Sequence, residues 1–102
     1  MTREDHLLVI IAEECNEVAQ RATKALRFGL EEVQPGQEQN NSLRILGELA
    51  DLLTAFDMLI EESAVMGRAN LDACKVLVEM RNAKRAKIEK FLLLSAECGR
   101  LA

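Results

Sequence analysis

Residues 43–60, LRILGELADLLTAFDMLI, decide the fold of this chain. Apolar side chains in this stretch recur at helical spacing, namely Ile45, Leu46, Leu49, Leu52, Leu53, Phe56, Leu59 and Ile60. They cover a face wider than one partner helix could bury. Because soluble proteins seldom expose so large an apolar patch, we expect an all-α helical bundle that is completed by homo-oligomerisation, as a homodimer or homotetramer.

The residues before this stretch predict how its helix begins and what precedes it. Asn41 or Ser42 can cap the N-terminus of the helix, which should run to about Ser63. The segment from Leu30 to Asn41 holds Pro35-Gly36 and a polar cluster, so it is predicted to be a loop.

A second helix is predicted on the N-terminal side of that loop. Residues 2–5, TRED, resemble a capping box with Asp in place of Glu. Gly29 can end the helix in a left-handed cap. Between these signals the apolar residues keep helical spacing from Leu7 onward, at Leu8, Ile11, Cys15, Val18, Ala19, Ala22 and Leu26.

The C-terminal part predicts one more long helix. Gly67 and Asn70 mark a break, and the helix should run from about Leu71 to Cys98, closed by Gly99 and Arg100. One seam of this helix has alternating spacings of three and four, which are typical of a buried heptad pattern. Its residues are Ala73, Leu77, Met80, Lys84, Lys87, Phe91, Leu94 and Cys98. We therefore predict one domain over residues 1–102 with about three long helices.

Composition limits the possible classes of protein. Residues of the AVILMFWYC set make up 49% of the chain but aromatic residues only 3%, so Leu, Ile, Val, Ala and Met must form the core. The net charge of −4 argues against nucleic acid as a partner. Three cysteines without a C-x-x-C pair favour small buried thiols in a reducing cytoplasm. No apolar run is long enough to span a membrane.

Two pairs of carboxylates mark the candidate site. Glu14 and Glu17 lie three residues apart, as do Glu48 and Asp51, so each pair shares one side of its helix. Each pair flanks an apolar stripe, and antiparallel packing of the two stripes would bring four carboxylates to one rim. Such a cluster repels itself strongly unless a cation lies within it. All-oxygen ligands suit Mg²⁺, and also Mn²⁺.

These motifs resemble those of a known superfamily. Residues 12–29, AEECNEVAQRATKALRFG, and residues 47–59, GELADLLTAFDML, carry an E-E-x-x-E motif, a loop and an E-x-x-D motif. This order resembles the all-α nucleoside triphosphate pyrophosphohydrolases, the MazG-like superfamily, and in particular its small members often carried by phages and mobile elements. The resemblance covers roughly residues 7–62 well and the last helix more loosely. The connection between the two motifs is long for the superfamily.

The resemblance implies Mg²⁺-dependent hydrolysis of a nucleoside triphosphate to a nucleoside monophosphate and pyrophosphate. Glu14, Glu17, Glu48 and Asp51 match the metal ligands of the superfamily, and Glu13 matches the first acid of its motif. Attack near the α-phosphorus is expected, with Glu13 or Glu17 accepting the proton of the attacking water. Within the superfamily, the resemblance does not choose among activities like those of dUTPases, dCTPases and phosphoribosyl-ATP pyrophosphohydrolases.

Cationic residues are the candidates for binding the phosphates. Lys84 and Lys87 occupy seam positions, where their stems could pack while the ammonium groups reach water or pair with core carboxylates. Alternatively they point at the metal site and neutralise the triphosphate, since MazG-like enzymes place basic residues on their last helix near the phosphates. Arg21 and Lys24 follow Glu17 by one and two turns and either meet phosphate or form solvated surface.

Other interpretations compete with this one. Phe28 could stack on a base, although a lone Phe at a helix end is more often a core residue. A non-catalytic helical interaction or regulatory module is the main alternative function. The residues favouring it form a basic cluster of Arg81, Lys84, Arg85, Lys87 and Lys90. A ferritin-like di-iron site needs E-x-x-H pairs, and this sequence has none.

Overall fold

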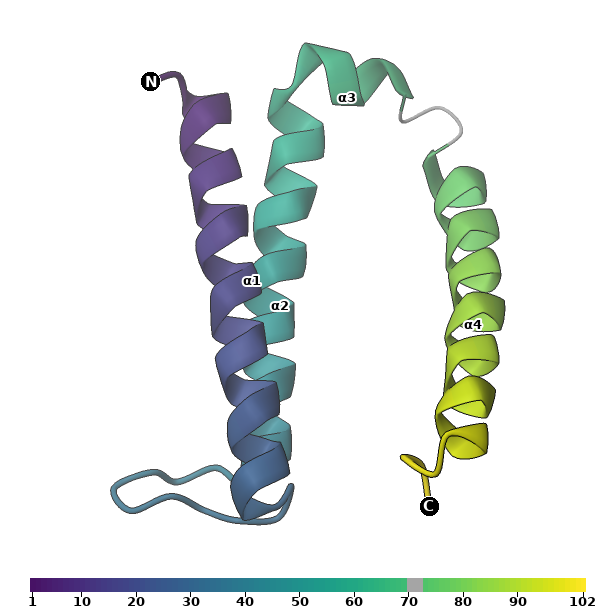
Figure 1. The fold of residues 1–102 in the computed structure, drawn as a ribbon. Coiled ribbons are helices and arrows are strands. Elements are labelled where there is room, and N and C mark those ends of the chain that lie inside the picture. Colours follow the sequence, from purple (N-terminus) through teal and green to yellow (C-terminus); the bar gives the residue numbers. More distant parts are fainter. Residues whose placement is uncertain (70–72) are drawn as a thin grey trace. The chain divides into compact units, whose positions relative to one another are not determined.

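The chain folds into helices (Figure 1). The structure is a computed structural model that describes residues 1–69 and 73–102, with side chains for residues 1–67 and 77–102. Within these residues there is no strand, and the helices are α1 (Arg3–Phe28), α2 (Asn41–Glu62), α3 (Ala64–Ala69) and α4 (Ala73–Glu97). The predicted all-α class and its three long helices are therefore confirmed. None of the described helices is long and apolar enough to cross a membrane.

The chain divides into two units, Met1–Gly67 and Arg68–Ala102, which are described separately. The short helix α3 lies in the break predicted around Gly67 and crosses this boundary. The predicted break residue Asn70 and the predicted helix start Leu71 lie outside the described residues.

The capping box predicted for α1 is present. The Thr2 hydroxyl accepts a hydrogen bond from the Asp5 amide at 3.1 Å, and the Asp5 carboxylate accepts one from the Thr2 amide at 2.7 Å. These bonds hold the pKa of Asp5 below its usual value. Gly29 ends α1 as predicted, with its amide donating to the Ala25 carbonyl. Its angles, φ 98° and ψ 149°, lie outside the left-handed helical region, so the cap differs in type from the prediction.

The cap of α2 lies one residue earlier than predicted. The Asn40 side chain, instead of that of Asn41 or Ser42, accepts from the Leu43 amide at 3.0 Å. Asn41 is buried, and its side-chain amide donates to the Gly29 carbonyl at 2.8 Å. Asn41 therefore ties the two ends of the predicted loop together.

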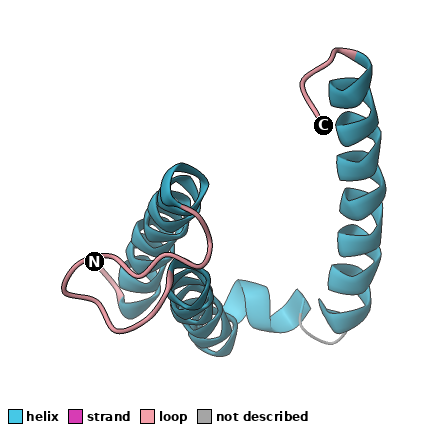
Figure 2. Cartoon of the chain, turned by 90° about the horizontal axis from the view of Figure 1, so that it is seen from below, coloured by secondary structure: helices cyan, strands magenta, loops and turns pink. Residues whose placement is uncertain are grey.

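Helices α1 and α2 form an antiparallel hairpin, in which they lie side by side in two views (Figures 1 and 2). Leu7 and Ala25 of α1, with Ala55 and Leu59 of α2, are the buried apolar residues of the seam between them. Heptad spacing on both helices adds half-buried residues to this seam, including Ile11, Val18, Ile45 and Leu52. At the open end, Arg3 and Glu62 form an ion pair at 2.7 Å.

Only part of the apolar stripe predicted on α1 meets α2. Leu7, Ile11 and Val18 of that stripe lie in the seam, whereas the others are exposed, namely Leu8, Cys15, Ala19, Ala22 and Leu26. On α2, Leu46, Leu49 and Leu53 are also exposed. The physical reason is that each helix carries two apolar stripes, and a two-helix hairpin buries only one of them. The prediction that one partner helix could not cover α2 agrees with this exposure.

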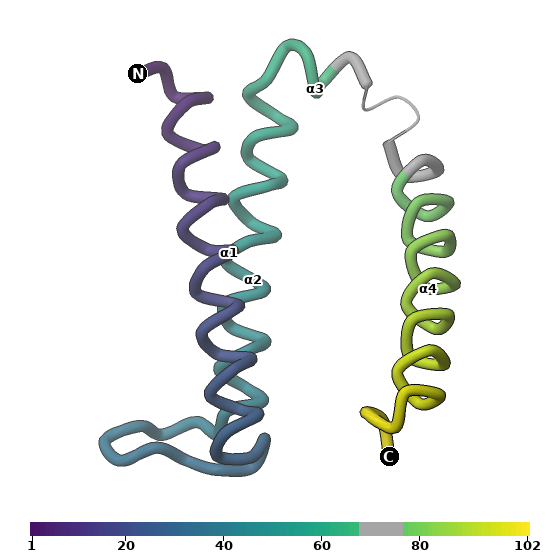
Figure 3. Tube along the Cα trace, in the orientation of Figure 1, coloured from purple at the N-terminus to yellow at the C-terminus, as the bar shows by residue number. Residues whose placement is uncertain are grey.

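Helix α4 forms the long element of the second unit (Figure 3). Its C-terminus is closed by Gly99 as predicted, with φ 74° and bonds from the Gly99 amide to the Ala96 carbonyl and from the Arg100 amide to the Ser95 carbonyl. This is the Schellman motif. Its predicted seam is exposed over the described side chains, which are Leu77, Met80, Lys84, Lys87, Phe91, Leu94 and Cys98.

The predicted burial of the cysteines is also wrong for the two whose side chains are described. Cys15 and Cys98 are free and exposed. Cys15 lies on the α1 stripe that faces away from α2, which explains its exposure. The side chains of Cys74 and of the seam residue Ala73 lie outside the described set.

Candidate metal centre

Three of the predicted carboxylates meet across the hairpin. Glu14 of α1 and Glu48 and Asp51 of α2 each offer one oxygen, and these oxygens lie within 4.8 Å of one another. Glu14 and Glu48 occupy seam positions and are half-buried, whereas Asp51 is exposed. They meet because antiparallel packing sets the middle of α1 opposite the first half of α2.

The cluster is electrostatically unfavourable without a cation. Burial raises the pKa of Glu14, and the charges of Asp51, Glu48 and Glu17 raise it further, as does a hydrogen bond to Glu48 that requires a proton. One oxygen of Glu14, Oε2, is buried and has no hydrogen-bond partner among the described residues. Buried polar atoms are normally satisfied, so this oxygen is an acceptor that a bound cation could satisfy.

The donor set fits a hard divalent cation. Carboxylate oxygens alone are the ligands typical of Mg²⁺ and Mn²⁺, and Mg²⁺ usually keeps several waters and binds substrate phosphates. The exposure of Asp51 leaves one side of the cluster open to such groups. Glu14, Glu48 and Asp51 would therefore hold the ion from the two helices.

The other two predicted acids lie outside this group. Glu17 is half-buried and its charge contributes to the raised pKa of Glu14, yet it is not among the three carboxylates within 4.8 Å. Glu13 is exposed. The structure thus brings together three of the four predicted ligands, and the roles of Glu13 and Glu17 stay predictions.

A hollow of about 600 Å³ opens beside the cluster, between α2 and the loop that joins it to α1. It is lined by Gly36, Gln37, Glu38, Gln39, Arg44, Gly47, Glu48 and Asp51. Gly36 sets the path of the loop. Its φ of 82° and the hydrogen bond from the Gln37 amide to the Gln34 carbonyl at 3.0 Å are typical of a type II turn over residues 34–37, with Pro35 and Gly36 at its centre.

The residues that line this hollow from Gly36 to Gly47 were not predicted as part of the site. Arg44, which donates to the Gln34 side chain at 2.8 Å, precedes Glu48 by four residues and Asp51 by seven. That spacing puts all three on one side of α2 and could have identified Arg44. No sequence pattern predicts that Gln37 and Gln39 of the loop line the hollow, because the path of the loop depends on the Asn41 contact and on the turn.

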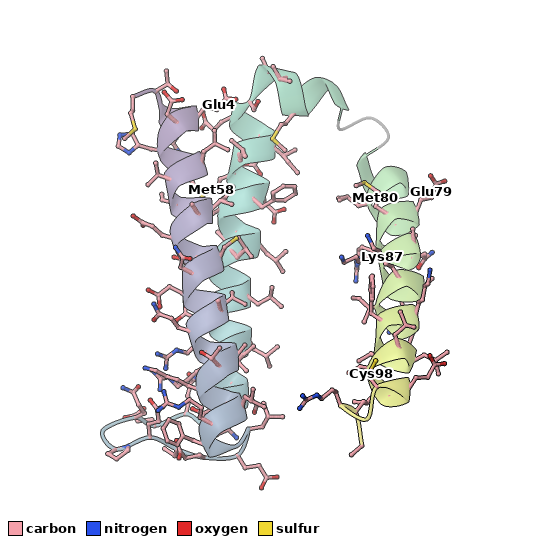
Figure 4. The ribbon with its side chains drawn as sticks, viewed as in Figure 1. Glu4, Met58, Glu79, Met80, Lys87 and Cys98 are labelled. Atoms are coloured by element: carbon pink, nitrogen blue, oxygen red, sulfur yellow. The ribbon has the colours of Figure 1, made fainter. Side chains whose placement is uncertain are left out.

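The predicted phosphate-binding residues differ in their surroundings. Arg21 is buried with 8% of its surface exposed, so the alternative of a solvated residue is wrong, and Lys24 is half-buried. Lys84 and Lys87 are exposed on α4 and share a shallow hollow with Leu77 and Met80. Figure 4 labels Met80 and Lys87 on the same side of that helix. Both lysines belong to the second unit, whereas the carboxylates belong to the first, and the role of the lysines stays a prediction.

Phe28, the residue predicted to contact a base, is exposed at the end of α1. The Arg27 guanidinium covers its ring at 5.1 Å from the centroid. One ring face is therefore already occupied, and the alternative of a core residue is wrong.

Comparison with known proteins gives no relative to guide the assignment. No family model, no curated protein and no solved structure matches this chain. The sequence motifs and the three clustered carboxylates are therefore the basis for assigning a function.

Proposed function

We propose that this chain is a Mg²⁺-dependent nucleoside triphosphate pyrophosphohydrolase of the MazG-like type, converting a (d)NTP to the (d)NMP and pyrophosphate. The observation that carries the proposal is the meeting of Glu14, Glu48 and Asp51 within 4.8 Å. These residues belong to the two acidic motifs, in the order that the superfamily resemblance requires. Mn²⁺ is a chemically suitable replacement for Mg²⁺.

The chemistry divides between the cation and the side chains. A bound divalent cation neutralises phosphate charge and makes water more acidic. Glu14, Glu48 and Asp51 hold that ion in our proposal. Glu17, whose charge acts on Glu14, is better placed than the exposed Glu13 to accept the proton of the attacking water.

The hollow beside the cluster is the proposed nucleotide site. Arg44 supplies a cation next to Glu48 and Asp51, and the Gln37 and Gln39 amides offer donors and acceptors for a base. A volume of about 600 Å³ lies in the range typical of small-molecule pockets. Lys84 and Lys87 are proposed to stabilise the leaving pyrophosphate, as the resemblance implies.

The active protein is proposed to be a homo-oligomer. Heptad spacing joins the exposed side chains of α1 into a stripe of mostly small residues, including Ala12, Cys15, Ala19 and Ala22. The exposed stripe of α2 carries the larger Leu46, Leu49 and Leu53. In a two-fold dimer, the small stripe of one copy can receive the large stripe of the other.

This assembly leaves the metal site free, because helical-wheel geometry puts the second stripes and the carboxylates on opposite sides of the hairpin. Light scattering should show a dimer or tetramer at micromolar concentration, and Leu53→Lys should lower the assembly state. A wild-type protein that stays monomeric would contradict this part of the proposal.

The activity is tested by incubating the full chain with a panel of NTPs and dNTPs plus Mg²⁺ and measuring pyrophosphate. Asp51→Asn should lower the rate more than about a hundredfold, since losing only a supporting group beside a metal already costs roughly 10–100-fold. Asp57→Asn is the matched control, because Asp57 is an exposed residue of the same helix that points away from the cluster.

Circular dichroism of each variant separates loss of the site from loss of the fold. Equal activity in Asp51→Asn and wild type would refute the proposed ligand set. If the wild type released no pyrophosphate from any nucleotide of the panel and bound no Mn²⁺ in calorimetry, a non-catalytic interaction module would be favoured. A reducing cytoplasm is the proposed compartment, because Cys15 and Cys98 are free thiols.

A further inference from the structure

Arg21 has an unusual environment for a charged residue. It is 8% exposed, and its Nε and Nη1 atoms are buried without a hydrogen-bond partner among the described residues. Within that part of the chain it also forms no ion pair, although Glu17 lies one turn earlier on the same helix. The guanidinium therefore has donors that nothing described in the protein uses.

An arginine cannot relieve this cost by losing its proton. The guanidinium group stays charged in proteins, unlike the amine of a buried lysine. A buried charge with unused donors is destabilising unless a partner accepts them. An anionic ligand would supply the missing acceptors, and planar guanidinium groups are well suited to phosphate oxygens.

The position of Arg21 relates it to the carboxylates. It follows Glu14 by seven residues, which is about two helical turns, so both face α2 from the same side of α1. Helical side chains lean toward the N-terminus of their helix. The Arg21 side chain is therefore directed along the seam toward the turn of Glu17 and the carboxylate cluster.

A second cation lies on the facing helix. Arg44 lines the hollow next to Glu48 and Asp51 and precedes them along α2. Because the helices are antiparallel, residues after Glu14 and residues before Glu48 both lie toward the loop end of the hairpin. Arg21 and Arg44 thus flank the carboxylates on the same, loop-facing side.

We infer that Arg21 binds a phosphate group of a polyphosphate whose neighbouring phosphate is held by the cation at Glu14, Glu48 and Asp51. The phosphate chain then runs along the seam, from the carboxylates toward the loop. This inference deepens the proposed function and rests on it. It assigns the unused donors of Arg21 to the substrate and makes Arg21 a binding residue of the site.

The test uses inorganic tripolyphosphate as the probe, titrated into the full chain by calorimetry in excess Mg²⁺. Arg21→Gln keeps a polar side chain of similar reach but removes the charge, and it should weaken binding at least about tenfold. Arg27→Gln is the matched control, since Arg27 is an exposed residue of the same helix. This control should stay within about twofold of wild type.

A separate titration with Mn²⁺ alone distinguishes the two proposals. Arg21→Gln should bind Mn²⁺ no more weakly than wild type, because removing a nearby positive charge does not weaken a cation site. Unchanged tripolyphosphate affinity in a folded Arg21→Gln protein would overturn the inference while leaving the metal site intact. Arg21-dependent binding without any nucleotide hydrolysis would refute the proposed activity but support the inference. Should the glutamine variant fail to fold, Arg21→Met, which suits a buried seam position, is measured in its place with the same expected loss.

Discussion

The two halves of the α1–α2 seam use their buried positions differently. Toward the open end the seam is apolar, with Leu7, Ala55 and Leu59 buried. Toward the loop, the seam keeps the buried Ala25, but comparable positions also hold the half-buried Glu14 and the buried Arg21. Both halves follow the same heptad spacing, so the backbone geometry does not explain the difference. The open half therefore supplies buried apolar contacts, whereas the loop half holds buried polar atoms without partners among the described residues, which our proposal assigns to ligand binding.

Asn41 shows that a buried polar residue in the loop half need not serve a ligand. It is 2% exposed, but its amide donates to the Gly29 carbonyl at 2.8 Å. Glu14 and Arg21 instead keep buried atoms that lack partners among the described residues. The comparison separates Asn41, which is satisfied within the fold, from Glu14 and Arg21, whose unsatisfied atoms our proposal assigns to ligands.

The largest effect on folding is expected in the open half. Leu59→Ala should lower the free energy of unfolding by about 2–5 kcal/mol, because it removes a buried side chain and leaves a cavity. Urea denaturation followed by circular dichroism measures this loss. Val9→Ala, at an exposed position of α1, should change stability by no more than about 0.5 kcal/mol. Equal effects of both substitutions would show that this half does not form the core.

A smaller loss is expected at Asn41. Asn41→Ala leaves the Gly29 carbonyl without its donor and should cost about 1–3 kcal/mol of unfolding free energy. Hydrogen exchange should also become faster in the loop of residues 29–40. Asn16→Ala, at an exposed position of α1, provides the comparison. A loop that exchanges at the wild-type rate in Asn41→Ala would contradict the tie between its two ends.

The smallest expected effect is a dependence of the unfolding free energy on pH in the metal-free protein. The pKa of Glu14 is raised above its ordinary value of 4.5, so the folded chain binds this proton more tightly than the unfolded chain. Its contribution to stability is therefore complete below about pH 4.5 and is lost as pH rises through the raised pKa. Asp5, whose pKa is lowered from 3.8, acts in the opposite direction and at lower pH.

Urea denaturation at several pH values above 4.5 measures this dependence. Glu14→Gln should flatten the profile. Saturating Mg²⁺ should reverse the slope, because carboxylate ligands must be deprotonated to bind the ion. A wild-type profile that coincides with that of Glu14→Gln would show that the carboxylates do not interact.

Local signals in the sequence predicted most of the fold. The capping box at Thr2, the end of α1 at Gly29 and the Schellman motif at Gly99 each depend on neighbouring residues, so they could be identified directly. The α2 cap was wrong by one residue because Asn41 is used in a contact with a residue distant in sequence. The α1 stripe was only partly right, because periodicity shows where apolar stripes lie but not which of two stripes a neighbouring helix covers.

In the candidate site, too, local spacing could be predicted from the sequence, whereas contacts between distant residues could not. Spacing predicted Glu14, Glu48 and Asp51, since residues three apart share a helix side and the loop makes the helices antiparallel. Arg21 was expected to be surface or phosphate-binding, and its burial depends on which stripe α2 covers. The wall formed by the loop required the three-dimensional course of residues 29–40, which local patterns do not specify.

Calorimetric titration of the metal-free chain with Mn²⁺ is the most direct test of a cation held between the two helices. Wild type should bind with a stoichiometry of at least one ion per chain. Glu48→Gln and Asp51→Asn should each weaken binding roughly tenfold or more, whereas Asp57→Asn should match wild type. Absence of binding in wild type, or equal binding in all four proteins, would contradict the account.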